Sequence, residues 1–537
     1  MSASTTTGRS AESGSAWAPL GRPVFRALWI AQFVSNIGTW MQTVGAQWLL
    51  LGHGATMVTL VQTASSLPIV LLALPSGVLA DRFDRRGLLL AMFAVSAVLT
   101  VLAFADALSA VPLLVLTFLL GCGTALMGPS WQAIQPELVE REQLGQASAL
   151  GAVNMNLARA VGPALGGVVV AAAGAGWVFG FNAVSFLGIA AVLVLWHRPK
   201  TTVPAAQQER LLTALYAGRR YVWNAPGVRR VLLRTALFIP GAAALWSLLP
   251  LIAADSLGMG SGGYGLLLGA VGVGAVAGAF ALPWLRQHLG INGILAAGAL
   301  MFALVLLVLA TVHITWVAIL VLLPAGVAWI GVLSTLNAAI QTRLPGWVRA
   351  RGLAVYLLVF QGGQAVAAPV WGALVQGLGL TTALLIGTAV MVLSALSLYR
   401  WKLYGMEGID PTLSDHWPTP PLVFVPGPAD GPVLVSVVYR VAPDDSAAFV
   451  DAMDRVAHSR RRTGAITWGL FQDGNEPGRF IENYLVGTWA EHLAQHHNRL
   501  TTTDRGFEDR VRALLLPGTE PEVTHAFDAS VVGPQAS

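Results

Sequence analysis

Long apolar stretches separated by short polar turns follow one another along residues 26–401. Each stretch is predominantly apolar over about 20 residues, the length that an α-helix needs to cross a hydrocarbon core of ~30 Å. Twelve such windows can be placed, at 26–50, 57–79, 88–107, 111–133, 147–172, 177–197, 231–253, 264–285, 291–311, 315–337, 353–376 and 382–401. The pattern predicts an all-α polytopic membrane protein with twelve transmembrane helices.

Basic residues fall in every second turn of this pattern. The turns without Lys or Arg are those near His53, Asp106, Gly174, Asp255, His313 and Gly379. The alternate turns carry the arginines of 82–86, Arg141, the run 198–230, Arg286 and the arginines of 343–351. Because short loops rich in Lys and Arg stay on the cytoplasmic side of a membrane, we expect both termini to be cytoplasmic.

Composition indicates a lipid environment for residues 26–401. Hydrophobic residues make up 55% of the chain and charged residues 11%, and the mean hydropathy is +0.65. A soluble globule of this composition would expose too much apolar surface. The net charge of +5 is spread along the predicted cytoplasmic rim, where an anionic leaflet explains it. We therefore expect the bilayer as a partner and no nucleic acid.

An internal repeat divides the membrane region into two halves. A shift of 206 residues superimposes Trp40 on Trp246, 133–135 on 339–341, Pro163 on Pro369 and Gly166 on Gly372. Six helices per half make the repeats parallel, an arrangement that places a substrate site between them near mid-membrane. We expect halves at 26–197 and 231–402, a cytoplasmic linker at 198–230, and a disordered cytoplasmic leader at 1–25.

A glycine, an aspartate and three arginines cluster between the second and third windows. They are Gly77, Asp81, Arg82, Arg85 and Arg86. The glycine permits close helix contact, the aspartate suits a helix terminus, and the arginines anchor the loop at the membrane surface. The stretch resembles the signature loop of the major facilitator superfamily. That resemblance implies a transporter working by alternating access, in which Asp81 helps to hold the outward-open state. For Arg85 and Arg86, simple anchoring of the loop at the membrane surface is an equally good explanation. The equivalent loop of the second half lacks the aspartate.

The fifth window contains a glycine- and proline-rich motif made of Gly162, Pro163, Gly166 and Gly167. The glycines allow tight helix approach, and the proline removes a backbone hydrogen bond and permits a bend. The motif resembles the fifth-helix motif of exporters of the superfamily, which favours efflux over uptake. The alternative is a packed, kinked helix without a role in transport direction.

Arg159 is the basic residue deep within an apolar window. A charge at mid-bilayer costs at least ~2.5–3.5 kcal/mol unless it faces a cavity or a partner. We expect it to face a polar cavity that binds an anionic or polyphenolic substrate; the alternative is a structural pair with Glu137. The other residues expected to line the cavity are Gln32, Asn36, Trp40, Asn154, Asn156, Gln361 and Gln364.

Energy coupling has a weak signature in the sequence. No Gly-rich phosphate-binding loop followed by Lys-Ser or Lys-Thr occurs, which argues against ATP hydrolysis by this chain. Resemblance to the superfamily implies proton antiport. The acids that are candidates to carry the proton are Asp81, Glu137 and Asp255. No cofactor and no catalytic residue are expected. The chain is predicted to be a transporter and not an enzyme, and a catalytic role of its C-terminal domain stays open.

The composition changes beyond Lys402. A proline-rich linker covers 403–432, a charged segment covers 433–530, and a disordered tail is expected at 531–537. Strands are predicted at 433–441, 465–472, 479–488 and 523–529, and helices at 444–463, 489–500 and 504–515. This order predicts a ferredoxin-like α+β domain.

His492, His496 and His497 follow the third strand of this segment. The stretch from Trp489 resembles small antibiotic-biosynthesis-monooxygenase-like domains, which usually dimerise. His492 and His496 are one helical turn apart, but no third ligand at diagnostic spacing accompanies them. We expect a solvated or interface helix and no metal site.

Together, the membrane region and this tail resemble the enterobactin-exporter branch of the superfamily. The resemblance implies a multi-pass protein of the bacterial inner membrane that exports a small molecule: a siderophore, another secondary metabolite or a drug. The alternative function is a membrane-anchored enzyme or sensor that acts through the C-terminal domain.

Overall fold

The computed structural model describes residues 17–72, 85–196, 211–403, 410, 412–414, 417, 422 and 424–529, of which 85, 86, 128–137, 141, 152, 156, 211–217 and 350 are described for the backbone alone. The chain forms two compact units. The first comprises 1–203, 236–333 and 357–399, and the second comprises 204–235, 334–356 and 400–537. The first unit contains most of the membrane region, and the second contains the C-terminal sheet domain.

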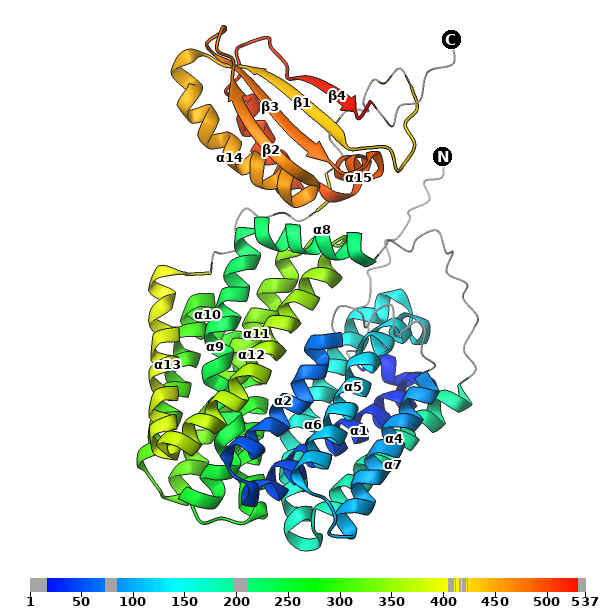
Figure 1. The fold of residues 1–537 in the computed structure, drawn as a ribbon, viewed down its shortest axis with the longest axis vertical. Helices are drawn as coiled ribbons and strands as arrows, with labels where there is room; N and C mark the ends of the chain where they lie inside the picture. The colour runs from blue at the N-terminus through cyan, green and yellow to red at the C-terminus, as the bar shows by residue number, and fades with distance from the viewer. Residues whose placement is uncertain are drawn as a thin grey trace, which may run out of the picture. The chain divides into compact units, whose positions relative to one another are not determined.

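Helices dominate the membrane region (Figure 1). Those of the N-terminal half are α1 (Pro23–Leu49), α2 (Ala55–Leu72), α4 (Arg85–Phe104), α5 (Ala110–Leu138), α6 (Leu144–Ala173) and α7 (Ala175–Leu195). Those of the C-terminal half are α9 (Pro226–Leu251), α10 (Ser261–Thr311), α11 (Thr315–Arg343), α12 (Arg349–Leu378) and α13 (Leu380–Arg400). Turns between them use glycines with positive φ, including Gly54 at 94° and Gly174 at 90°.

α10 represents two membrane spans. Its 51 residues would extend about 77 Å at 1.5 Å per residue, more than twice the hydrocarbon thickness. Gly290 interrupts it with non-helical backbone angles, φ 62° and ψ 178°, which a residue with a Cβ rarely adopts. The break falls between the predicted windows 264–285 and 291–311, so the prediction of twelve spans is confirmed.

Ten described helices are long and apolar enough to cross a membrane, and α10 counts once among them. α1, with 27 residues, is long enough to span the membrane, but it is less apolar than these ten helices and is not counted among them. Its face toward the interior carries amide side chains, among them Gln32 and Asn36. The polarity of α1 therefore reflects what it lines and not a location outside the membrane.

The structure adds helices to two segments outside the predicted spans. Residues 17–25 of the expected disordered leader form a 3₁₀ turn, Ala18–Gly21, and the start of α1. Pro23 starts α1 early because its fixed φ suits the first helical position. The expected linker contains the amphipathic helix α8 (Leu211–Asn224), and α9 already begins at Pro226. The basic character of 198–230 masked the helical period of α8.

The internal repeat is visible in how the halves pack. In α6, Gly167 faces Gly265 of α10, where an added Cβ would lie 2.5 Å from the Gly265 Cα. In α12, Gly372 faces Thr59 of α2, where an added Cβ would lie 2.2 Å from the Thr59 Oγ1. The shift of 206 residues relates Gly166, the chain neighbour of Gly167, to Gly372, and it also relates Thr59 to Gly265. The two crossings between halves are therefore equivalent under the repeat.

The second unit contains the predicted α+β domain. Its strands are β1 (Val433–Arg440), β2 (Ala465–Gln472), β3 (Arg479–Val486) and β4 (Glu522–Phe527), and its helices are α14 (Ser446–Thr463), α15 (Trp489–Ala494) and α16 (Thr502–Arg512). The sheet is antiparallel with the order β2-β3-β1-β4. This is the βαββαβ order of the ferredoxin-like plan.

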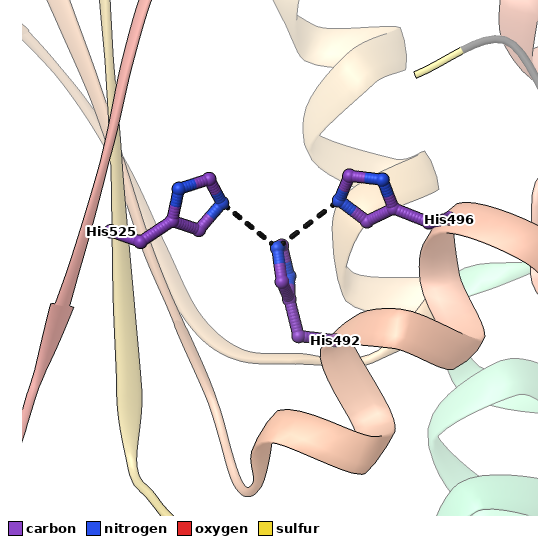
Figure 2. Close-up of side chains that lie close together, drawn as sticks. All are labelled: His492, His496 and His525. Carbon is purple, nitrogen blue, oxygen red and sulfur yellow. Dashed lines mark hydrogen bonds between the residues drawn. The ribbon is translucent and has the colours of Figure 1, made fainter. Parts of the chain in front are cut away.

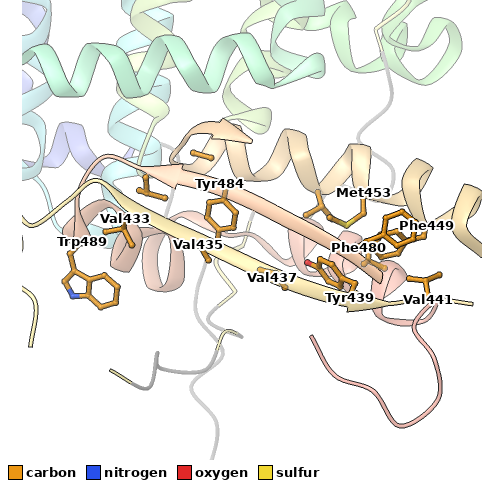
Figure 3. Close-up of a cluster of buried hydrophobic side chains, with 14 residues drawn as sticks. Val433, Val435, Val437, Tyr439, Val441, Phe449, Met453, Phe480, Tyr484 and Trp489 are labelled. Carbon is orange, nitrogen blue, oxygen red and sulfur yellow. The ribbon is translucent and has the colours of Figure 1, made fainter. Parts of the chain in front are cut away.

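Alternation along the strands builds the core of this domain (Figure 3). Val433, Val435 and Val437 are buried on one face of β1, where Phe449 and Met453 of α14 belong to the same apolar cluster. β1 pairs residue for residue with β3, from Val433 opposite Val486 to Arg440 opposite Arg479. Because side chains alternate between faces, the opposite face of the sheet is left uncovered by the helices.

A buried charge network joins α14, β3 and α16. Arg460 forms ion pairs with Glu482, at 3.0 Å, and with Glu508. The carboxylate of Glu482 also accepts hydrogen bonds from Tyr439, at 2.7 Å, and from the Trp468 indole, at 2.8 Å. All three charged side chains are buried, so each carboxylate depends on these donors for its solvation.

α8 packs against α14 within the second unit. The Arg462 guanidinium lies 5.8 Å from the Tyr221 ring centroid, and that of Arg499 lies 5.0 Å from the Trp347 centroid. The rings of Tyr221 and Trp347 meet edge to face at 5.6 Å. Burial raises the pKa of Tyr221 to about 12, so this phenol stays protonated. The C-terminal domain thus contacts the segment that links the two membrane halves.

Candidate functional site

A cavity of about 330 Å³ lies in the first unit and is lined by both halves. Its N-terminal wall comes mainly from α1, α2 and α5, with Arg159 supplied by α6, and its C-terminal wall comes from α9, α11 and α12. The lining side chains able to hydrogen-bond through amides are Gln32, Asn36, Gln42, Gln62, Asn182, Gln361 and Gln364. The size falls within the range typical of small-molecule sites.

Arg159 of α6 supplies positive charge to this cavity. Its guanidinium carbon lies 5.2 Å from the ring centroid of Trp40 in α1, a cation–π distance. Its Nε is buried without a hydrogen-bond partner. Among the lining residues that the structure describes, Arg159 is the one ionisable side chain. The described residues offer it no acidic partner, and the side chain of Glu137 lies outside them.

The C-terminal half contributes an aromatic wall. Trp246 of α9 and Trp329 of α11 meet at 5.1 Å between ring centroids, and Trp329 meets Phe360 of α12 at 6.3 Å. The indole N–H groups of Trp246 and Trp329 are buried without a described partner. Like the Arg159 Nε, both are donors.

The repeat gives the cavity two related walls with different chemistry. Trp40 and Trp246 are repeat equivalents, and both line the cavity. Gln42 and Gln62, however, correspond to Leu248 and Leu268. At these two positions the N-terminal half carries amides where the C-terminal half carries leucines. The amides of the C-terminal wall come instead from Gln361 and Gln364 of α12, beside its aromatic side chains.

Asn154 does not belong to the described lining, contrary to expectation. It is 2% exposed and lies between α1 and α6. Its Oδ1 accepts from Asn36 at 2.9 Å, and its Nδ2 donates to the Trp29 carbonyl at 2.8 Å. Asn36 also accepts from Gln32 at 3.1 Å. Asn154 therefore positions the residues that line the cavity.

Two cavity amides form a bridge between the halves. Gln62 of α2 donates to Gln364 of α12 at 3.0 Å, and Gln364 donates to Gln361 at 3.3 Å. Gln361 and Gln364 are brought together as expected from their spacing. Sequence reasoning missed Gln62, although an amide inside an apolar window was a usable signal.

The fifth-helix motif packs helices and lies outside the described lining. An added Cβ on Gly162 would lie 2.7 Å from the Trp40 Cβ, and one on Gly166 would lie 2.8 Å from the Met41 Cα. Gly167 faces the other half, as described above. Pro163 lies within α6. The motif thus places Trp40 beside Arg159 and joins α6 to both α1 and α10.

Several expected site residues have no described side chain. Gly77, Asp81 and Arg82 lie outside the described residues. The side chains of Arg85, Arg86, Asn156 and Glu137 are likewise outside them. Asp255 is described: it is exposed in the turn that ends α9 and is not among the described lining residues.

A second cluster lies in the C-terminal domain, where three histidines converge (Figure 2). The Nε2 of His492 lies 2.9 Å from that of His525 and 3.2 Å from that of His496. His492 is 0% and His496 4% exposed, so the expected solvated or interface helix is wrong for these two side chains. Burial lowers the pKa of His492 to about 3, so its imidazole is neutral.

Sequence reasoning missed His525 because it lies 29 residues beyond His496 on a separate strand. β4 pairs with β1 so that His525 is opposite Val435. Opposite residues share a face of the sheet, and Val435 is buried beneath the helices. The alternation of Val523, His525 and Phe527 was a signal that this histidine points inward.

Comparison with known proteins matches nearly the whole chain to a family described as "Transmembrane secretion effector", over residues 14–531. Enterobactin exporter EntS of Salmonella typhi is 30% identical over 264 residues, which cover 48% of this chain and 63% of that protein. EntS of Shigella boydii serotype 18 is also 30% identical, over 48% of this chain and 62% of that protein. The matched region thus spans less than two thirds of these relatives.

Solved structures with the same fold include a mutant of the nucleoside transporter NupG, with a TM-score of 0.57 and 14% identity, covering 71% of this chain and 100% of that one. An auto-inhibited peptide transporter of the POT family has a TM-score of 0.56 and 14% identity, covering 74% of this chain and 99% of that one. At such identities, the likeness shows the fold alone.

Proposed function

The chain belongs to the transmembrane secretion effector family of major facilitator superfamily transporters, and on this premise we propose that it exports an anionic, aromatic small molecule by alternating access. The cargo class is a catecholate siderophore or a related phenolic secondary metabolite or drug. The observation that carries the proposal is Arg159, which lies in the cavity on the face of Trp40 without an acidic partner among the described residues.

The chemistry of the cavity supports this cargo class. Catecholate oxygens are acceptors, and the donors without described partners around the cavity are the Arg159 Nε and the two indole N–H groups. Aromatic rings of the cargo suit the wall formed by Trp246, Trp329 and Phe360. The name of the EntS relatives, enterobactin exporter, points to the same class.

Contacts between the halves support loading from the cytoplasm. Tyr264 donates to Gln47 at 2.5 Å, and Thr56 donates to Gln376 at 2.8 Å. These contacts, with the Gly167–Gly265 crossing, lie near the turns that contain no Lys or Arg. Under the positive-inside rule, those turns are periplasmic. We therefore propose that this conformation is closed toward the periplasm, with both termini in the cytoplasm.

We also propose that proton antiport drives export. Asp81 and Glu137 are the preferred carriers, since Asp255 is exposed at the end of α9. Protonation of an acid near the interface of the two halves would remove a negative charge and so shift the equilibrium between the two conformations. In this scheme Asp81, with Arg82, stabilises the outward-open state.

For the C-terminal domain we propose dimerisation through the open face of its sheet. Phe471 is 57% and Leu434 39% exposed on that face, beside the half-buried Ile481 and Leu485. A second copy of the chain would cover these side chains, as in the monooxygenase-like domains that the sequence resembles. Phe471→Glu should then give monomers where the wild type gives dimers, as measured by light scattering of the full chain in detergent.

Transport into inverted membrane vesicles tests the main proposal. Catecholate, neutral and cationic compounds are compared, with and without an imposed proton gradient. Arg159→Ala should lower the apparent affinity for the catecholate by about 10–100-fold, because a hydrogen bond to a charged group contributes ~1.5–3 kcal/mol. Arg159→Lys should lose less. Arg286→Ala, which removes an exposed cation of α10 outside the cavity, is the control.

The outcomes separate the parts of the proposal. Catecholate transport indifferent to Arg159→Ala would overturn the binding site, and transport insensitive to the gradient would overturn the antiport. A chain ended at Lys402 addresses the alternative of an enzyme or sensor in the C-terminal domain. Export that survives this truncation makes the domain accessory to transport.

A further inference from the structure

The histidine cluster of the C-terminal domain has the geometry of a metal site. One ligand nitrogen from each of His492, His496 and His525 can be chosen so that all lie within 4.8 Å of one another. Zinc–imidazole bonds of about 2.0–2.1 Å in tetrahedral geometry separate ligand nitrogens by about 3.3 Å. The observed separations of 2.9 and 3.2 Å around His492 are close to this value.

We propose that His492, His496 and His525 bind a divalent first-row transition metal ion, with Zn²⁺ as the expected occupant. Neutral imidazole is a good ligand for zinc, copper, nickel and iron. No thiolate joins the cluster, since the single cysteine, Cys122, lies in α5. Among the described residues, the His, Cys, Asp and Glu side chains that group closely enough to share an ion are these three histidines.

A neighbouring amide supports the ligand role of His492. The Oε1 of Gln495 lies 3.3 Å from the His492 Nδ1, and its Nε2 donates to the Thr463 hydroxyl at 3.2 Å. With the amide held in this orientation, the Nδ1 of His492 is the protonated nitrogen. Its Nε2 then carries the lone pair and faces the other two imidazoles. Metal-binding histidines usually have a second-shell acceptor of this kind.

The surrounding rings hold the imidazoles in place. Trp489 lies 5.3 Å from His492 and 6.1 Å from His525 between ring centroids. Trp417 meets His496 edge to face at 4.7 Å. His492 and His496 come from consecutive helical turns and His525 from a strand, so the ligands are fixed by regular elements. Pre-positioned ligands lower the ordering cost of metal binding.

The site leaves room for an exchangeable ligand. Three protein ligands with a fourth position open are characteristic of reactive zinc sites, whereas structural zinc sites use four. His492 and His496 are buried, while His525 is half-buried at the edge of the sheet. Of the three histidines, His525 is therefore the most accessible to solvent. Three neutral ligands leave the ion with its full charge, which favours an anion or hydroxide at the fourth position.

Zinc binding by the tag-free full chain in detergent tests the proposal. Equilibrium dialysis against Zn²⁺, followed by elemental analysis, should give one ion per chain. His492→Ala and His525→Ala should each abolish this stoichiometric binding. His497→Ala is the matched control, because His497 is adjacent but exposed and outside the cluster. It should retain one ion per chain.

Two further measurements keep the test decisive if a variant unfolds. Co²⁺ bound to the wild type should show visible absorption of a tetrahedral site, and added Zn²⁺ should displace it. Gln495→Met, which keeps the ligands, should weaken zinc affinity by about 10–100-fold. Wild-type protein with neither stoichiometric zinc nor a cobalt spectrum would overturn the proposal and leave a hydrogen-bonded imidazole cluster. None of these readouts depends on transport.

Discussion

Gly167 of α6 and Gly265 of α10 bring the two membrane halves into backbone contact. A Cβ added to Gly167 would lie 2.5 Å from the Gly265 Cα, and one added to Gly265 would lie 2.7 Å from the Gly167 Cα. Side chains of any size are therefore excluded from this crossing in the conformation described. A transporter that alternates between two states must separate and rejoin these helices.

Gly265→Val should impair transport by forcing α6 and α10 apart. Overpacking costs about 1–3 kcal/mol, which shifts a two-state conformational equilibrium by about 5–150-fold. Accessibility of engineered cysteines near Gly54 and Gly174, in a Cys122→Ser background, should rise together with the loss of transport. Gly188→Val is the control, because an added Cβ there meets nothing within 4 Å. Equal transport and equal cysteine accessibility in Gly265→Val and Gly188→Val would contradict the proposal that the contact of α6 with α10 controls the conformational equilibrium.

Asn154 and Asn36 should have separable effects. Asn154→Ala removes the acceptor of Asn36 and the donor to the Trp29 carbonyl, and each buried polar group left unsatisfied costs about 1–3 kcal/mol. We expect a lower melting temperature as the main consequence. Asn36→Ala, which changes the cavity wall directly, should raise the apparent KM for cargo. Thermal melts and transport kinetics of both variants distinguish a positioning residue from a lining one.

Arg460→Met should destabilise the C-terminal domain by about 3–5 kcal/mol, the usual cost of leaving buried charges unpaired. The variant leaves Glu482 and Glu508 buried without their cation. Chemical unfolding followed by tryptophan fluorescence measures the effect. Arg455→Met, on an exposed position of the same helix, should change stability little. A small difference between the two variants would show that the network contributes little to folding.

Trp347→Ala should loosen the contact of the C-terminal domain with α8. It removes the ring that the Arg499 guanidinium and Tyr221 both face. Hydrogen exchange of backbone amides in α8 and α14 should then become faster. Trp223→Ala, whose ring is 72% exposed, serves as the control on α8 itself. Unchanged exchange in the Trp347 variant would rule out these rings as the basis of docking.

The membrane architecture was readable from the sequence because its signals are local. Span length, the position of arginines in alternate turns and the break at Gly290 each depend on short stretches of chain. The strands of the C-terminal domain were readable for the same reason, since alternation of valines in 433–441 is a local pattern. The helix α8 was not predicted, because the basic residues of 198–230 obscured the helical period of its apolar side chains.

The sites needed the tertiary structure. Arg159 was identifiable from the cost of a charge in lipid, but its partner Trp40 lies on another helix and was placed there by the packing of Gly162 against α1. Asn154 and Asn36 exchange a hydrogen bond over 118 residues of sequence. His525 joins His492 only through the pairing of β4 with β1. Contacts between distant residues depend on how elements pack, so hydrophobic period and charge predict the elements while packing decides which side chains meet.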